Sequence, residues 1–372
     1  LSDQYITSGQ TSSLVNISSS TTNVTFNWTA VADSGITGLV NFSDTDTTVI
    51  PAETLFNSGS EPLNGTYTIY PVLDSPIDCP ADPIVYKVIV NPIASVISVE
   101  DQLLCNEQLT SIIFISGTSG GNVTYNWTSD IEIGAGLSGN DNMNFTATNL
   151  TTAPIVATIT VTPIFENGGV TNEGDSVSFT ITVNPSAQVE DITNQLVCNG
   201  DTTSIVEFAT QNTGGTTTYA WTNNTPSIGL SDSGSGDILA FTATNITTEP
   251  VVATITVTPT FEFDGKVCDG EDKNFTITVN PTAQVDQPLD QVVCNLDEVS
   301  VLFSTQNTGG STSYSWVSDT QIGAGLSGTG DMAFTATNIT TEPVVATITV
   351  TPTFENGGIV CDGEDKTFTI TV

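Results

Sequence analysis

The chain contains no histidine and no arginine, and four lysines are its only basic side chains. Against them stand 41 aspartates and glutamates, which give a formal net charge of −37 at pH 7. Nucleic-acid binding and docking on anionic lipid both need clustered basic side chains, so the composition excludes the first and argues against the second. Long apolar runs are also missing. Without about 18 consecutive apolar residues, we expect no membrane insertion of this segment.

The missing histidine also bears on catalysis, because histidine is the usual general base and a common metal ligand. The carboxylates lie in turns that recur along the chain, where a single active site is not expected. The lysines fall in strand or turn positions that we expect to be exposed: Lys87, Lys266, Lys273 and Lys366. The sequence therefore predicts a non-enzymatic protein with no catalytic residue and no required cofactor.

The main positive feature of the sequence is a long internal repeat. "ITVNP" or a close variant ends at Pro92, Pro185 and Pro281, and similar segments follow each proline. We assign four repeats, of which the first is divergent and N-terminally incomplete: residues 1–91, 92–184, 185–280 and 281–372. Because the pattern is cut at both ends, we interpret the chain as a segment of a longer tandem array, or as a product whose N-terminus is created by cleavage.

Each repeat is expected to be all-β. Segments such as "VVATITVTPTF" alternate apolar and hydroxyl residues with period two, and no stretch has a sustained helical period. The number of short strands predicts a two-sheet, immunoglobulin-like sandwich. An aromatic-x-Trp pair recurs, and we expect its tryptophans to anchor the cores rather than to stack on carbohydrate: Trp28, Trp127, Trp221 and Trp316.

The joins between repeats contain proline and no Gly/Ser linker. Proline fixes φ and restricts the residue before it, so a strand that runs through "VNP" into the next repeat forms a stiff connection. The sequence therefore predicts four tandem immunoglobulin-like β-sandwich domains in an elongated rod.

The six cysteines fall into two types by their place in the repeat. The first type precedes the second strand and comprises Cys105, Cys198 and Cys294, with Thr7 at this place in repeat 1. The second type precedes the last strand and comprises Cys79, Cys268 and Cys361, with Asn172 at this place in repeat 2.

Pairing a first-type cysteine with the second-type cysteine of the following repeat predicts two disulfides, Cys105–Cys268 and Cys198–Cys361. In this scheme Thr7 faces Asn172, so both absences belong to one missing bridge, and Cys79 and Cys294 pair with a neighbouring repeat or chain. In an immunoglobulin-like domain the two cysteine positions lie at opposite ends, which exceeds the reach of a disulfide of about 7 Å between Cα atoms. This favours the interdomain scheme, and pairing within a repeat or free cysteines remain the alternative.

The motifs "VCNGDTTSIV", "TYAW", "ATITVTP" and the Cys-x-Gly segment before "FTITVNP" resemble the PKD-like tandem repeats of Bacteroidota surface and gliding-type adhesins. The resemblance covers essentially the whole chain. It implies an extracellular, cell-surface location, export by the type IX secretion system, and a stalk or filament role. It also suggests O-linked glycosylation at an Asp-Ser/Thr motif, which is matched at Thr47, Ser176 and Thr202.

Acidic clusters recur in the turn before the last strand. Their oxygens are hard ligands of the kind that Ca²⁺ prefers, although no EF-hand spacing is present and solvated turns are the alternative. The candidate calcium ligands are Asp269, Glu271, Asp272, Asp362, Glu364 and Asp365.

The sequence thus predicts a non-enzymatic structural segment of a large secreted cell-surface repeat protein that supports adhesion or surface motility. Its expected partners are further repeats of the same or identical chains, and a surface glycan or protein ligand. Two alternatives remain: a glycan- or calcium-dependent adhesin module, and a self-assembling filament subunit. Because one bridge is missing, bending or proteolysis is expected to concentrate near Asn91 and Pro92.

Overall fold

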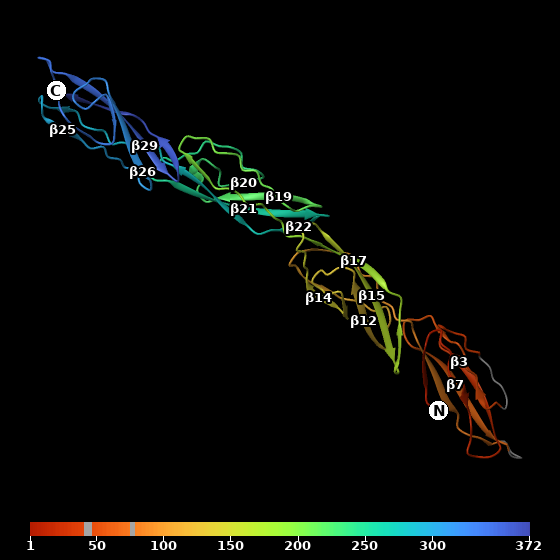
Figure 1. Ribbon diagram of the computed structural model, residues 1–372. Helices are drawn as coiled ribbons and strands as arrows, with labels where there is room; N and C mark the ends of the chain where they lie inside the picture. The colour runs from red at the N-terminus through yellow and green to blue at the C-terminus, as the bar shows by residue number, and fades with distance from the viewer. Residues whose placement is uncertain (41–46, 75–78) are drawn as a thin grey trace. The chain divides into compact units, whose positions relative to one another are not determined.

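A computed structural model describes the backbone of residues 1–40, 47–74 and 79–372. The chain divides into two compact units, residues 1–185 and 186–372, each of which holds two repeats. Strands make up the regular structure of the described residues, together with one short 3-10 helix at Pro226–Ile228 (Figure 1). No helix in these residues is long and apolar enough to cross a membrane. The predicted all-β, immunoglobulin-like fold is confirmed.

Repeat 1 is built around a sheet with the strand order β1-β9-β7-β3, and β8 pairs with β7. Two small ribbons, β2-β5 and β4-β6, complete it. The strands are β1 (Gln4–Thr7), β2 (Val15–Asn16), β3 (Val24–Ala32), β4 (Ile36–Thr37), β5 (Val49–Ile50), β6 (Phe56–Asn57), β7 (Leu63–Leu73), β8 (Cys79–Pro80) and β9 (Ile84–Asn91).

Repeat 2 has the order β10-β17-β15-β12-β13, with β16 on β15 and a separate β11-β14 ribbon. Its first strand lies parallel to its last, with Leu104 opposite Val183, and the other pairs are antiparallel. The strands are β10 (Gln102–Cys105), β11 (Leu109–Ile112), β12 (Asn122–Ser129), β13 (Ser138–Asn140), β14 (Met143–Thr146), β15 (Ile155–Asn167), β16 (Val170–Glu173) and β17 (Val177–Asn184).

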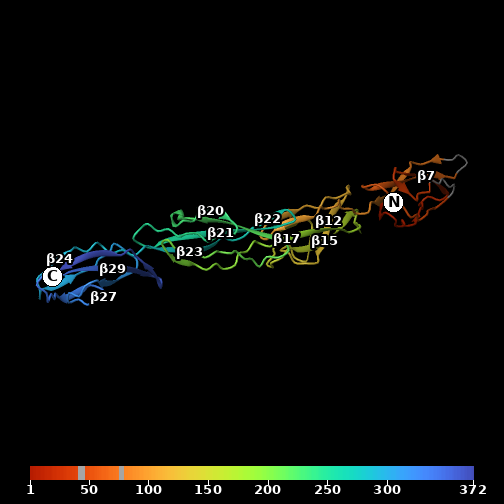
Figure 2. The ribbon, with the colours of Figure 1, turned by 90° about the horizontal axis from the view of Figure 1, so that it is seen from above.

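Repeats 3 and 4 reproduce this plan. Their sheet orders are β18-β23-β21-β19-β20 and β24-β31-β29-β26-β27, with β22 on β21 and β30 on β29. In Figure 2, β21 and β23 run side by side, as their register requires. The strands of repeat 3 are β18 (Gln195–Cys198), β19 (Thr216–Asn223), β20 (Ser233–Ser235), β21 (Val251–Phe263), β22 (Lys266–Asp269) and β23 (Lys273–Asn280). Those of repeat 4 are β24 (Gln291–Val292), β25 (Glu298–Val301), β26 (Ser311–Ser318), β27 (Ser327–Thr329), β28 (Met332–Thr335), β29 (Val345–Asn356), β30 (Ile359–Asp362) and β31 (Lys366–Thr371).

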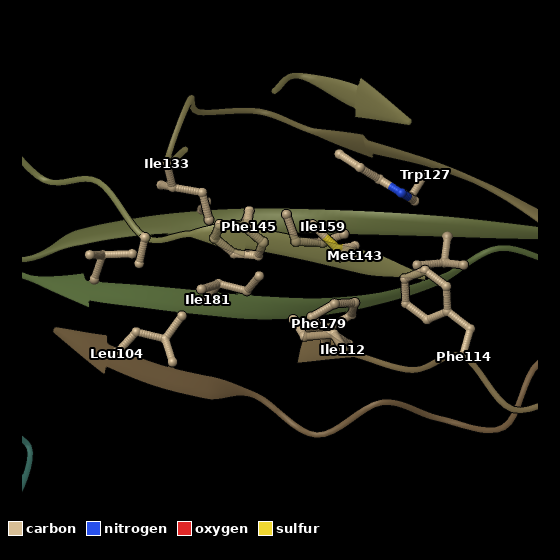
Figure 3. Close-up of a cluster of buried hydrophobic side chains, with 14 of the residues drawn as sticks. Leu104, Ile112, Phe114, Trp127, Ile133, Met143, Phe145, Ile159, Phe179 and Ile181 are labelled. Carbon is tan, nitrogen blue, oxygen red and sulfur yellow. The ribbon is translucent and has the colours of Figure 1, made fainter. Parts of the chain in front are cut away.

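Each repeat encloses its own hydrophobic core between the main sheet and the facing segments. Alternate residues of β15 are buried, which is the period-two pattern of a strand with one face on a core. Figure 3 shows the core of repeat 2, with Trp127 and Phe114 toward one end and Leu104 toward the other. All four tryptophans are buried, at 3 to 7% exposure, so none offers a ring face to a carbohydrate.

Candidate functional site at the repeat junctions

Two junctions between repeats lie inside a compact unit. The first junction joins repeats 1 and 2 at Pro92, and the last junction joins repeats 3 and 4 at Pro281. At each, the final strand of the earlier repeat ends in an asparagine that directly precedes the proline. Because proline restricts the preceding residue to extended conformations, the strand direction continues into the junction.

The asparagine before the proline pairs with a second asparagine at the tip of the hairpin that follows in the next repeat. At the last junction, Asn280 Nδ2 donates to the backbone O of Asn356 at 3.2 Å, and Asn356 Nδ2 donates to Asn280 Oδ1 at 2.9 Å. At the first junction, Asn91 and Asn167 make the same two bonds at 3.1 and 3.0 Å. We call this reciprocal pair the asparagine clasp.

The clasp is buried, which raises its energetic importance. Asn91 and Asn280 are both 0% exposed. A buried amide that loses its partner costs about 1–3 kcal/mol, since its lost hydration is no longer compensated. Opening either junction without rehydrating these amides is therefore unfavourable.

The tip of the same hairpin packs on the first strand of the preceding repeat. Gly357 has φ +61°, and a Cβ added there would lie 2.5 Å from Cδ2 of Leu196. Gly168 has the same φ, and a Cβ there would lie 2.2 Å from the ring of Tyr5. Glycine is required for both the left-handed backbone and the close approach. Each hairpin is thus shaped to fit the repeat before it.

A backbone hydrogen bond forms a second contact at each junction. At the last junction, the N–H of Thr308 donates to the carbonyl of Thr248 at 2.9 Å. At the first junction, the N–H of Ser119 donates to the carbonyl of Ser60 at 2.8 Å. Two separated contacts restrict rotation about the join more than one contact can.

A disulfide crosses the last junction. It joins Cys198, the final residue of β18, to Cys361 in β30, with 5.6 Å between the Cα atoms and a sequence separation of 163. This is one of the two pairings expected from the spacing of the repeats. The hairpin that carries Cys361 is the one that carries the clasp residue Asn356, so covalent and hydrogen-bonded contacts hold the same element.

The first junction has polar residues at the corresponding places. Asn172 accepts a bond from the N–H of Ala94 at 2.8 Å and donates to the carbonyl of Pro92 at 3.1 Å. It therefore fixes the backbone just after the join. Thr7 is buried, and its Oγ1 has no hydrogen-bond partner among the described residues. The substitution of the cysteine pair thus leaves a structured but non-covalent junction.

The remaining cysteines differ in state. Cys105 and Cys268 are each disulfide-bonded, and their pairing with one another stays a prediction. Cys294 is free and exposed. The side chain of Cys79 lies outside the described part of the structure, although its backbone pairs with Leu73.

The acidic clusters do not form the calcium site that the sequence suggested. Within the described residues, no three carboxylate, cysteine or histidine side chains gather closely enough to hold a metal. Asp272 instead accepts a bond from Thr258 Oγ1, and Asp365 one from Thr351 Oγ1, both at 2.5 Å. These bonds hold the two carboxylates on the neighbouring strand, and among the described residues Asp269, Glu271, Asp362 and Glu364 form no metal-binding group with them.

The three candidate glycosylation residues differ in accessibility. Ser176 and Thr202 are exposed, and Ser176 Oγ lies 2.8 Å from Thr162 Oγ1. Thr47 is half-buried, and the preceding Asp46 lies outside the described residues. At Asn245, the start of an Asn-Ile-Thr triplet, the amide is buried and donates to the carbonyls of Glu249 and Val279, so it is not available for modification.

The asparagine clasp was not foreseen from the sequence, although a signal was present. At each of the two junctions described above, one asparagine directly precedes the proline, and the repeat after the proline contains the second asparagine in "FENGG". The two asparagines are 76 residues apart and belong to consecutive repeats. The pairing is therefore visible only when each repeat is compared with the one that follows it.

Comparison with known proteins agrees with this description. A family model described as a PKD-like domain matches residues 5–94, which correspond to the most divergent repeat. The match is to repeat 1, and the equivalent sheets of the repeats indicate a tandem of immunoglobulin-like sandwiches. The search of curated proteins found no match.

Several solved multidomain chains match this chain with low sequence identity and low TM-scores. N-cadherin EC1-4 of Drosophila is 12% identical, with 96% of this chain and 93% of that chain covered and a TM-score of 0.31. The three N-terminal domains of the Hoc outer capsid protein of bacteriophage RB49 are 14% identical, with 75% and 98% covered and a TM-score of 0.36. At these values, no ligand or partner of those proteins transfers to this chain.

Proposed function

We propose that this chain is a non-enzymatic, load-bearing segment of a secreted cell-surface repeat protein, in which it acts as a stalk or filament. The observation that carries the proposal is the repetition of one contact set at both described junctions. A clasp, a glycine hairpin and a backbone bond recur where a flexible linker could have stood. Such repeated geometry serves a protein whose task depends on the angle between its domains.

The disulfide supports a mechanical role. Cys198 and Cys361 close a covalent loop that contains most of repeats 3 and 4, so tension on the chain bypasses the cores inside that loop. In the proposed scheme Cys105 and Cys268 close the equivalent loop one repeat earlier. Load is then carried by disulfides rather than by strand hydrogen bonds.

An extracellular location follows from the same chemistry. Structural disulfides persist in oxidising compartments and are rare in the cytosol. Attachment to a cell surface, export by the type IX system and a role in adhesion or gliding belong to the proposal and are supported by the sequence resemblance alone. Its proposed partners are further repeats of this kind. A glycan or protein ligand is not located by any feature described above.

Distance measurements between repeats 3 and 4 test the proposal. Spin labels are placed at the exposed positions Val252 and Val317 through cysteine substitutions, in the whole chain with Cys79→Ser and Cys294→Ser. We expect a single narrow distance distribution from pulsed electron paramagnetic resonance. The matched control inserts a Gly-Ser linker between Asn280 and Pro281 and broadens the distribution. A wild-type distribution as broad as that of the linker control contradicts the proposal.

A further inference from the structure

Repeat 3 has a surface that is covered by repeat 4. Repeat 4 presents the equivalent surface of its own at the end that carries Cys294. We call this surface the free pole. It comprises four residues, and the counterparts in repeat 3 are read from the shared motifs "VCN" and "TNITTEP". The free pole consists of Val292, Cys294, Asn295 and Thr341, which correspond to Leu196, Cys198, Asn199 and Thr248.

The free pole already has the conformation of its covered counterpart. The N–H of Cys294 donates to Asp297 Oδ2, as that of Cys198 donates to Asp201 Oδ2. Asn295 Oδ1 accepts from the N–H of Asn338 at 2.9 Å, and the equivalent bond at Asn199 is 2.7 Å. The surface is therefore preformed, and a partner need not pay to order it.

Exposure distinguishes the two surfaces. Leu196, Cys198, Asn199 and Thr248 are all half-buried because repeat 4 lies on them, whereas all four residues of the free pole are exposed. Val292 is 84% exposed, which leaves an apolar side chain in water at the place where Leu196 meets the glycine of the hairpin. A cover of the same shape would bury it.

We propose that the free pole is a docking site for the cysteine-bearing hairpin of a further PKD-like repeat, and that Cys294 forms a disulfide with that hairpin. The occupant has the pattern of residues 354–361, in which Asn-Gly-Gly makes the tip and a cysteine follows in the returning strand. The proposal rests on the load-bearing function and names the partner that such a segment needs. The partner is argued from the last junction, where this hairpin covers the equivalent surface.

Charge does not drive this docking. The hairpin carries Glu355 and Asp362, and the pole is flanked by Asp297 and Glu298, so the two surfaces repel weakly. The same kind of repulsion exists at the last junction, where a covalent bond is present. We therefore expect the non-covalent contact to position the cysteines and the disulfide to hold them.

The bond forms by thiol–disulfide exchange. The Cys294 thiol loses its proton, and the thiolate attacks the sulfur of a partner cysteine that carries a small thiol as a mixed disulfide. The new S–S bond forms as the old one breaks, and the small thiol leaves with the proton. No net oxidation occurs in this step, because the mixed disulfide was already oxidised by the small-molecule disulfide pool outside the cell.

A cyclic peptide tests the proposal on the whole chain. The probe is residues 352–363 closed through the backbone, since an isolated hairpin is only marginally stable, with its cysteine joined to cysteamine. Intact mass follows attachment to the protein, and peptide mapping locates it. We expect attachment at Cys294 at least tenfold faster than for a cyclic peptide of the same composition in scrambled order, and none at that position in Cys294→Ser.

A substitution at the exposed Val292 separates docking from simple thiol reactivity. Val292→Asn, which adds no charge beside the thiol, is expected to slow the peptide toward the scrambled rate and to leave the reaction with cystamine, a small disulfide, unchanged. Equal rates for the native and scrambled peptides overturn the proposal. Because the spin labels report on a junction that does not involve Cys294, this failure and a failure of the load-bearing function are distinguishable.

Discussion

Asn280 and Asn356 hold one another across the last junction, each donating its amide N–H to an oxygen of the other. Asn91 and Asn167 repeat the arrangement at the first junction. The clasp links the end of one sheet to the hairpin tip of the next. It therefore explains how a join without a linker holds the two repeats at one orientation as well as close together.

Removing one member of the clasp should loosen the last junction. In Asn356→Ala the buried Oδ1 of Asn280 loses its donor, which costs about 1–3 kcal/mol. We expect faster amide hydrogen exchange in residues 278–283, by about 5- to 160-fold where the junction opens locally. Val360→Thr, at a 57% exposed position of the same hairpin, is the matched control and should leave exchange unchanged. Unaltered exchange in Asn356→Ala would show that the clasp does not limit opening.

Thr7 offers a stabilising substitution. Its hydroxyl is buried without a hydrogen-bond partner among the described residues, so Thr7→Val replaces an uncompensated polar group with a methyl group of similar size. We expect a gain of about 1 kcal/mol in the unfolding free energy of repeat 1. Thr7→Ser keeps the hydroxyl, loses the methyl group and should be destabilising. Urea unfolding read by pulse proteolysis measures both, and a loss of stability in Thr7→Val refutes this reading.

The missing bridge at the first junction can be supplied. In the double variant Thr7→Cys, Asn172→Cys, the introduced cysteines occupy the places that Cys198 and Cys361 occupy at the last junction. Loop closure predicts a gain of about 5 kcal/mol, against which the two lost, partly buried bonds of Asn172 cost about 0.5–1.5 kcal/mol each. We expect net stabilisation under oxidising conditions only.

Non-reducing peptide mapping of this double variant should find the new disulfide, and cleavage near Asn91 and Pro92 should fall relative to wild type. The single variant Asn172→Cys is the control, because it loses the bonds and gains no bridge. Its junction should be cleaved faster than that of wild type. Absence of the crosslink would mean that the two places are not equivalent to the cysteine pair of the last junction.

A buried tyrosine should make repeat 1 sensitive to alkali. Tyr67 is fully buried and donates to Glu53 Oε2 at 2.5 Å; burial, and then this bond, raise its pKa well above the ordinary value of 10.0. Above pH 10 the unfolded chain loses the phenolic proton and the folded chain keeps it. Stability should therefore fall by about 1.4 kcal/mol per pH unit from this group.

Tyr67→Phe removes the titrating group, so its stability should fall less steeply above pH 10. At neutral pH this variant should be less stable than wild type, because Glu53 loses a buried donor. Urea midpoints for repeat 1 across this pH range give both slopes. Burial also raises the pKa of Tyr86, and that contribution is common to the two proteins. Parallel slopes would exclude Tyr67 as the source.

Regular features of the repeat could be predicted from the sequence, and single contacts could not. The alternation of apolar and polar residues in 155–167 predicts which face of β15 is buried. The places of Cys198 and Cys361 within their repeats predict that these two cysteines can meet. The hydrogen bonds of Asn172 depend on backbone groups of the join itself, which no pattern encodes. In the sequence, the carboxylates of Asp272 and Asp365 resembled calcium ligands. Their threonine hydrogen-bond partners lie on another strand, so these bonds could not be predicted from the local sequence.

The extension of the whole chain under force tests the load-bearing account most directly. With its disulfides intact, the chain cannot extend the segment between Cys198 and Cys361, which are 163 positions apart, when it is pulled from its ends. At about 3.5 Å per extended residue, opening this loop alone should add about 570 Å to the fully unfolded length, and with the proposed Cys105–Cys268 bridge also reduced the total gain should be about 650 Å. The gain in unfolded length is measured by holding the oxidised protein under tension and adding a reductant. Equal unfolded lengths before and after reduction would contradict the account.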